Sequence, residues 1–109
     1  MKSDRVYLEQ IRESITKIRN FTSGYEHKRF AADQKTQSAV IMQLVLIGEL
    51  VKKVSKEIQS KIDLPWKDIA GFRDRAIHDY YNIDLEIVWN TLQGDLFTME
   101  NAINKFLKN

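Results

Sequence analysis

Apolar residues recur at intervals of three and four positions along nearly the whole chain, and this periodicity is the strongest constraint on the fold. Such spacing places apolar side chains on one face of an α-helix. The 109 residues include one proline and four glycines, so few positions carry a turn signal. The pattern predicts an all-α fold.

The first predicted helix carries an apolar stripe formed by Leu8, Ile11, Ile15 and Ile18. Ser3 or Asp4 is the candidate for its start, because short polar side chains accept hydrogen bonds from the first free N–H groups of a helix. The break Thr22-Ser23-Gly24 marks its predicted end. The sequence is compatible with a short helical turn over residues 25–32.

A long helix is predicted to begin after Asp33, a candidate cap, and to continue to Ile58. Its main stripe is Val40, Leu44, Ile47, Val51, Val54 and Ile58, and a second apolar row is Ala39, Met42, Leu46 and Leu50. A helix with two apolar sides needs cover on both. A second copy of the chain would supply that cover, which predicts a dimer. Alternatively, a short bundle wraps this helix completely within one chain.

The next helix is predicted to start at Pro65, with Asp63 as its cap, and to stop near His78. Asp84 is the predicted cap of one long final helix, whose apolar residues repeat as far as Phe106. We therefore expect an up-and-down helical bundle of about four main helices plus a short one. The length suits one domain over residues 1–109.

Cysteine is absent, so the chain offers neither disulfides nor a thiolate zinc site, and the cytoplasm is the expected location. The first five residues lead into an amphipathic stretch rather than a continuous apolar run. The sequence therefore predicts no signal peptide and no membrane span.

The net charge of +2 is distributed unevenly. Residues 1–62 hold twelve basic and seven acidic side chains, whereas residues 63–109 hold five basic and eight acidic ones. A polyanion should prefer the first half, where Lys52, Lys53, Lys56 and Lys61 lie close together. The same cluster is also typical of an ordinary solvated helix face.

The candidate chemistry lies between Gly71 and Tyr80. Arg73 and His78 are about 140° apart on an ideal helix, so they converge only if the helix ends or distorts, or if Arg73 reaches along it. In an extended chain Tyr80 would lie on the same side as His78. A base and a cation suit cleavage of an RNA phosphodiester without a metal or cofactor. On spacing alone, the pattern is more typical of basic side chains that stabilise a helix C-terminus than of a site.

The order Arg73, four residues, His78, one residue, Tyr80 resembles the HepT-like toxins of the HEPN superfamily. Further matching segments cover residues 33–40, 47–49, 64–66, 69–71 and 84–89. This ordered series extends over about residues 4–107. Asp74 stands where the family carries a polar residue, often Asn or Asp.

The resemblance implies a homodimeric helical bundle that acts as a metal-independent RNA endonuclease. Arg73 would stabilise the scissile phosphate, His78 would serve as base or acid, and Asp74 would orient one of them. One histidine cannot accept the 2′-hydroxyl proton and protonate the leaving oxygen at the same moment, whereas two copies across a dimer cleft could.

The resemblance also implies a partner, a minimal nucleotidyltransferase antitoxin that transfers AMP to Tyr80. The added bulk and negative charge would occupy the position that an RNA phosphate needs. The assembly would be a homodimer or a larger hetero-oligomer with the antitoxin.

Two other functions fit the sequence. The chain could be a non-catalytic helical binding partner or regulatory subunit of a nucleotidyltransferase, or a purely structural oligomer held by its apolar central helix. Within that helix Glu49 is unusual, because a carboxylate among apolar neighbours needs a partner. We expect a structural pairing with Arg73, Arg75 or a tyrosine.

Overall fold

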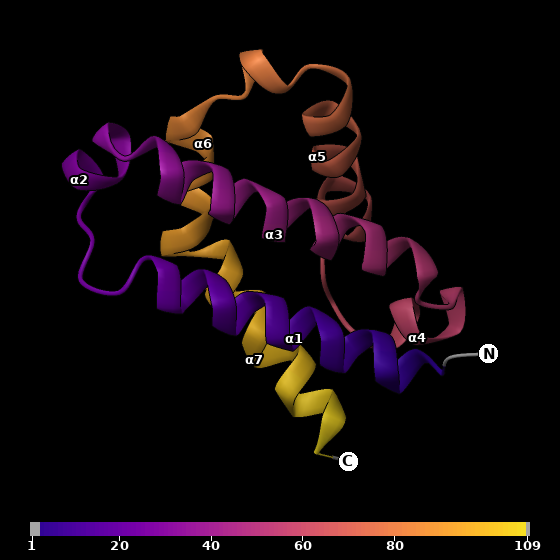
Figure 1. Cartoon of the computed structure of the whole chain (residues 1–109). Coiled ribbons are helices and arrows are strands. Elements are labelled where there is room, and N and C mark those ends of the chain that lie inside the picture. The colour runs from indigo at the N-terminus through magenta and orange to yellow at the C-terminus, as the bar shows by residue number, and fades with distance from the viewer. Residues whose placement is uncertain (1–2, 109) are drawn as a thin grey trace.

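The computed structural model describes residues 3–108, which form seven α-helices and one short 3₁₀ helix (Figure 1). In chain order these are α1 (Asp4–Phe21), α2 (His27–Ala32), α3 (Gln34–Lys53), α4 (Lys56–Lys61), α5 (Trp66–His78), η1 (Tyr80–Asn82), α6 (Leu85–Gln93) and α7 (Asp95–Leu107). Residues 3–108 contain no β-strand, so the all-α prediction is confirmed.

Helix α1 begins and ends where the sequence predicts. The Ser3 side chain accepts a hydrogen bond from the Val6 N–H, and the four residues of the predicted stripe are fully buried. The Thr22 N–H donates to the Ile18 carbonyl at the end of the helix. Gly24 then takes a positive φ of 77°, a conformation that glycine adopts without steric cost.

Helix α3 starts at its predicted cap but ends earlier than predicted. Asp33 accepts a hydrogen bond from the Thr36 N–H. The helix stops at Lys53 because Val54 is extended, and Ser55 then caps the separate helix α4. Both the Ser55 N–H and its hydroxyl donate to the Asp4 carboxylate, at 2.8 and 2.7 Å, which fixes this break against the start of α1.

Helix α5 starts without the predicted cap. Pro65 is itself the N-cap residue, and within residues 3–108 no side chain, including that of Asp63, accepts a capping hydrogen bond there. The first residue of the helix is anchored instead, because the Trp66 indole N–H donates to the carbonyls of Gln59 and Ile62 at 3.1 and 3.0 Å.

The prediction of one long final helix is wrong, because this segment forms two helices, α6 and α7. Asp84 caps α6 as predicted. Gly94 then leaves the helical conformation, with φ −133° and ψ −65°, and α7 starts at Asp95. Val88 of α6 and Ile103 of α7 are both fully buried, so each part contributes separately to the core.

Helix α3 is the centre of the bundle. It packs against α1 and α5, while α7 packs on α1 and α6. Figure 1 shows α1 and α3 running side by side in opposite directions, with α5 rising from the other side of α3 toward η1. The predicted up-and-down bundle is therefore confirmed, although it contains more short helices than expected.

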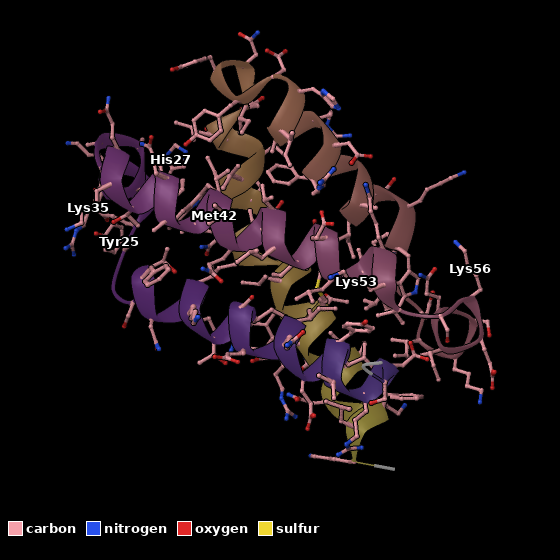
Figure 2. The ribbon with its side chains drawn as sticks, turned by 45° about the vertical axis from the view of Figure 1, so that its right-hand side comes forward. Tyr25, His27, Lys35, Met42, Lys53 and Lys56 are labelled. Carbon is pink, nitrogen blue, oxygen red and sulfur yellow. The ribbon has the colours of Figure 1, made fainter. Side chains whose placement is uncertain are left out.

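One side of α3 lacks cover from the other helices of residues 3–108. Met42 is 56% exposed and Leu46 is 42% exposed, although Val40, Leu44 and Ile47 on the other side are buried. Figure 2 shows Met42 midway along α3, between Lys35 and Lys53. The interpretation that the bundle wraps this helix completely is therefore wrong.

None of the helices within residues 3–108 combines the length and apolar character that crossing a membrane requires.

Candidate functional site

The candidate site lies where α5 ends. The helix continues through His78, and the Asp79 N–H donates to the Arg75 carbonyl at 2.9 Å. Asp79 then leaves the helical conformation, with φ −148° and ψ 55°, and the chain turns through η1. The predicted helix end near His78 is confirmed.

Arg73 points toward α3 and lies between two carboxylates. Its Nε is 2.7 Å from Glu49 Oε2, in an ion pair without hydrogen-bond alignment, and its Nη1 donates to Asp74 Oδ1 at 3.1 Å. The hydrogen bond to Asp74, reinforced by the charges of both carboxylates, raises the pKa of Arg73. The predicted pairing of Glu49 with an arginine is thus confirmed.

Asp74 links Arg73 to a second cation. Lys52 of α3 donates to the same oxygen, Asp74 Oδ1, at 2.6 Å. The hydrogen bonds from Lys52 and then from Arg73 lower the pKa of Asp74, so this carboxyl group is ionised at neutral pH. Glu49, Arg73, Asp74 and Lys52 form an alternating chain of charges between α3 and α5, which we call the charge chain.

Gly48 allows the two helices to approach at this point. A Cβ atom at Gly48 would overlap the Arg73 Cβ and lie 3.1 Å from its Cγ and 3.2 Å from the Ile69 carbonyl oxygen. Only a glycine fits without displacing backbone. The side chain of Arg73 therefore leaves α5 directly against the α3 backbone, beside Glu49.

His78 lies on a different side of α5. It is exposed and lines a surface hollow of about 450 Å³ between α5, η1 and the start of α6. The hollow is lined by Phe72, Asp74, Arg75, Ala76, His78, Asp79, Asn82, Ile83, Asp84 and Ile87. Arg73, about 140° from His78 around the helix, does not line it. Asp74 connects the two positions, because it contacts Arg73 and also lines the hollow.

Tyr80 faces α3 rather than the hollow. Its hydroxyl is 3.3 Å from Ser38 Oγ, within hydrogen-bond distance, and the side chain is 45% exposed. Asp79, with ψ 55°, is neither helical nor extended, and Tyr80 already belongs to η1, so the extended geometry that would align His78 with Tyr80 does not develop. Within one chain, Arg73, His78 and Tyr80 surround the end of α5 without converging on one point.

Carboxylates are numerous around His78. Asp79 accepts a hydrogen bond from the Asn82 side chain at 2.9 Å, and Asp84 accepts one from the Glu86 N–H as the cap of α6. Within residues 3–108, no three or more His, Asp or Glu side chains are grouped in a way that would hold a metal ion.

The chain is similar in sequence to a known family and to several known proteins. A family model described as ribonuclease HepT-like matches residues 11–106, which include α5, η1 and most of the bundle. The chain belongs to the HepT-like ribonuclease family. The resemblance stated from the sequence is thereby confirmed.

Relatives of the HepT-like chain match over almost its full length. One from Thermococcus cleftensis, named probable ribonuclease HepT, is 34% identical over 98% of both chains. Two others with provisional RNase names come from Caldanaerobacter subterraneus and Methanocaldococcus jannaschii. The Caldanaerobacter relative is 33% identical, over 99% of this chain and 97% of its own length. The Methanocaldococcus relative is 37% identical, over 94% of this chain and 88% of its own length. No solved structure matches the chain significantly.

Sequence reasoning missed three residues of this site. Gly48 had a usable signal, because a glycine inside an apolar helix weakens the helix unless close packing requires it. Lys52 looked like part of a solvated face, and only the tertiary structure pairs it with Asp74. Ser38 had no signal, since its contact with Tyr80 joins positions 42 residues apart.

Proposed function

We propose that the chain is an RNA endonuclease and the toxin of a toxin–antitoxin system. Membership of the HepT-like ribonuclease family supports this proposal. The observation that carries it is the end of α5, where His78 is exposed beside a hollow and Arg73 is fixed nearby by the charge chain. An exposed imidazole is available for proton transfer, and a fixed guanidinium is available for a phosphate.

The reaction follows from these groups. His78 accepts the proton of a ribose 2′-hydroxyl as that oxygen attacks the adjacent phosphorus. The bond from phosphorus to the 5′-oxygen breaks, and a second acid supplies the proton that the leaving oxygen needs. Arg73 stabilises the negative charge on the phosphoryl oxygens. The products are a 2′,3′-cyclic phosphate and a 5′-hydroxyl, and the route needs no metal ion.

A homodimer would complete this site. One His78 cannot be base and acid in the same step, whereas the partner's His78 would supply the second proton transfer. The uncovered side of α3 supports such a dimer, because Met42 and Leu46 lie on it at successive turns together with Glu49. A second copy on this face would bring two charge chains, and with them two copies of Arg73, close together. A composite active site further requires that both His78 side chains reach the same cleft.

An antitoxin of the nucleotidyltransferase class would neutralise this enzyme through Tyr80. The Tyr80 hydroxyl would attack the α-phosphorus of ATP, losing its proton, and pyrophosphate would leave. Tyr80 is partly exposed and its hydroxyl lies within hydrogen-bond distance of Ser38, so an enzyme could reach it. The attached AMP would add bulk and a negative phosphodiester next to Ser38 on α3, and this charge would repel an approaching RNA backbone.

A second candidate function is a non-catalytic partner or regulatory subunit of a nucleotidyltransferase. One observation favours it: Arg73 already contacts two carboxylates, and Asp74, Asp79 and Asp84 surround the hollow beside His78. In this alternative the segment would bind or present Tyr80 to the nucleotidyltransferase without cutting RNA.

Expression of the chain alone in growing bacteria separates the two functions. The endonuclease predicts growth arrest that His78→Ala relieves and that His27→Gln, a change of the other histidine, does not. The non-catalytic function predicts no growth arrest from the parent protein or from either variant. Intact-mass measurement after incubation with ATP and the antitoxin tests the AMP transfer, which Tyr80→Phe should abolish.

A further inference from the structure

We propose that Tyr81 is a stacking platform for one nucleobase of the RNA substrate, an inference that rests on the proposed ribonuclease function. Its side chain is 98% exposed, the highest value among the exposed large hydrophobic residues within residues 3–108. A ring that buries almost no surface adds almost nothing to the stability of the chain. Packing therefore does not explain an aromatic residue here.

The turn that presents Tyr81 is well held. In η1 the Asn82 N–H donates to the Asp79 carbonyl at 3.1 Å, and the Ile83 N–H donates to the Tyr80 carbonyl at 3.2 Å. The Asn82 side chain adds a bond to the Asp79 carboxylate at 2.9 Å. These hydrogen bonds hold the backbone on both sides of Tyr81, so its ring projects from an ordered turn.

The ring faces of Tyr81 are free. Tyr80 meets it edge to face, with ring centroids 6.0 Å apart and planes at 89°. Because Tyr81 is 98% exposed, this contact leaves its ring almost wholly open to solvent. Bases of single-stranded RNA stack on such open aromatic faces.

The surroundings of Tyr81 favour contact with a nucleobase of the RNA over contact with a phosphate. Its neighbours Asp79 and Asn82 line the hollow beside His78, together with the Asp84 carboxylate. Carboxylates repel the RNA backbone. An uncharged aromatic face at this edge can still bind a nucleotide next to the cleaved bond, through its base. Every base has a stacking face, so the contact would raise affinity for RNA without reading its sequence.

RNA binding in the inactive His78→Ala background tests the proposal, with affinity measured by fluorescence anisotropy on a short labelled RNA. Adding Tyr81→Ala should lower affinity by about 5- to 150-fold, the usual effect of losing one base–aromatic stack. Tyr81→Phe and Tyr81→Trp should keep near-parent affinity. Phe97→Ala, which removes an exposed aromatic on α7, should leave affinity unchanged.

Abasic RNAs make the test specific. A series of RNAs should each lack one base at successive positions. At one position the loss caused by Tyr81→Ala should disappear, because no base remains to stack. An equal loss on every abasic RNA, or no loss on intact RNA, would overturn the proposal. Dissociation of a dimer by Tyr81→Ala would do so as well, because Tyr81 would then belong to a protein interface.

Cleavage measured in parallel separates this inference from the proposed function. RNA cleavage without an effect of Tyr81→Ala on binding would refute the stacking and keep the enzyme. Base-dependent binding by a parent protein that cuts no RNA would keep the stacking and refute the enzyme. Failure of the parent protein to bind RNA would overturn both.

Discussion

Gly48 and Arg73 meet where α3 and α5 cross, and their backbones approach so closely that no side chain fits at Gly48. Gly48→Ala should therefore destabilise the fold by about 1–3 kcal/mol, the usual cost of overpacking a tight contact. Urea unfolding followed by circular dichroism measures this change.

Gly94→Ala is the matched control for this prediction. A Cβ atom at Gly94 would meet nothing within 4 Å, and the backbone there has a negative φ. The variant should have near-parent stability. Equal stability losses for the two variants would show that the crossing of α3 and α5 is not the cause.

The pairing of Glu49 with Arg73 should stabilise the fold most at low salt. Both side chains are partly exposed, so the contribution is small and screened by ions. Glu49→Gln should lower the urea midpoint in low salt, and the difference should shrink in 1 M NaCl. Glu13→Gln, which breaks an exposed pair with Lys17, should have less effect. A Glu49→Gln protein altered only in turnover would contradict the structural pairing.

Asp33 should make the free energy of unfolding depend on pH. Hydrogen bonds from the Thr36 hydroxyl, the Tyr25 hydroxyl and the Thr36 N–H lower its pKa from 3.8 to about 2. A folded-state pKa below the unfolded value stabilises the fold above the unfolded pKa, and this contribution is lost as pH falls from about 4 toward 2. Unfolding free energy should decline across this window.

Asp33→Asn tests the source of that decline. Asparagine keeps a capping oxygen for α3 but has no titrating carboxyl group. The decline between about pH 4 and pH 2 should become shallower in this variant. An unchanged pH profile would assign the acid sensitivity to other carboxyl groups.

Charge placed on the uncovered side of α3 should prevent dimer formation. Met42→Glu should convert the proposed dimer to monomer in sedimentation velocity, and RNA cleavage should fall with the dimer. Phe97→Glu changes a residue of similar exposure, 54% against 56%, on α7 instead. It should keep both the dimer and the activity. A monomeric parent protein, or a dimer that survives Met42→Glu, would contradict the use of this face.

Local signals explain what could be predicted from the sequence. Caps at Ser3, Asp33 and Asp84 depend on residues within one helical turn, and the structure places all three as predicted. The break after α3 combines the local cap Ser55 with a distant contact, because Ser55 also donates to Asp4 at the start of α1. Apolar periodicity continues across that break and therefore could not reveal it.

The candidate site was predictable only in part for the same reason. The helix end at His78 followed from neighbouring residues. The cost of burying charge indicated that Glu49 needs a partner but left Arg73, Arg75 and a tyrosine open, and the structure shows Arg73. The contacts of Lys52 and Ser38 join α3 to the α5–η1 segment, so they depend on how the helices cross. Spacing alone could not show that His78 and Tyr80 lie on different sides.

Cleavage of a defined RNA by purified protein, with EDTA present and the product ends identified, tests the proposed function most directly. We predict fragments ending in a 2′,3′-cyclic phosphate and a 5′-hydroxyl, cleavage by His27→Gln near the parent rate, and loss of about a hundredfold or more of that rate in His78→Ala. Cleavage by His78→Ala at the parent rate, or products carrying a 5′-phosphate, would contradict the proposed mechanism.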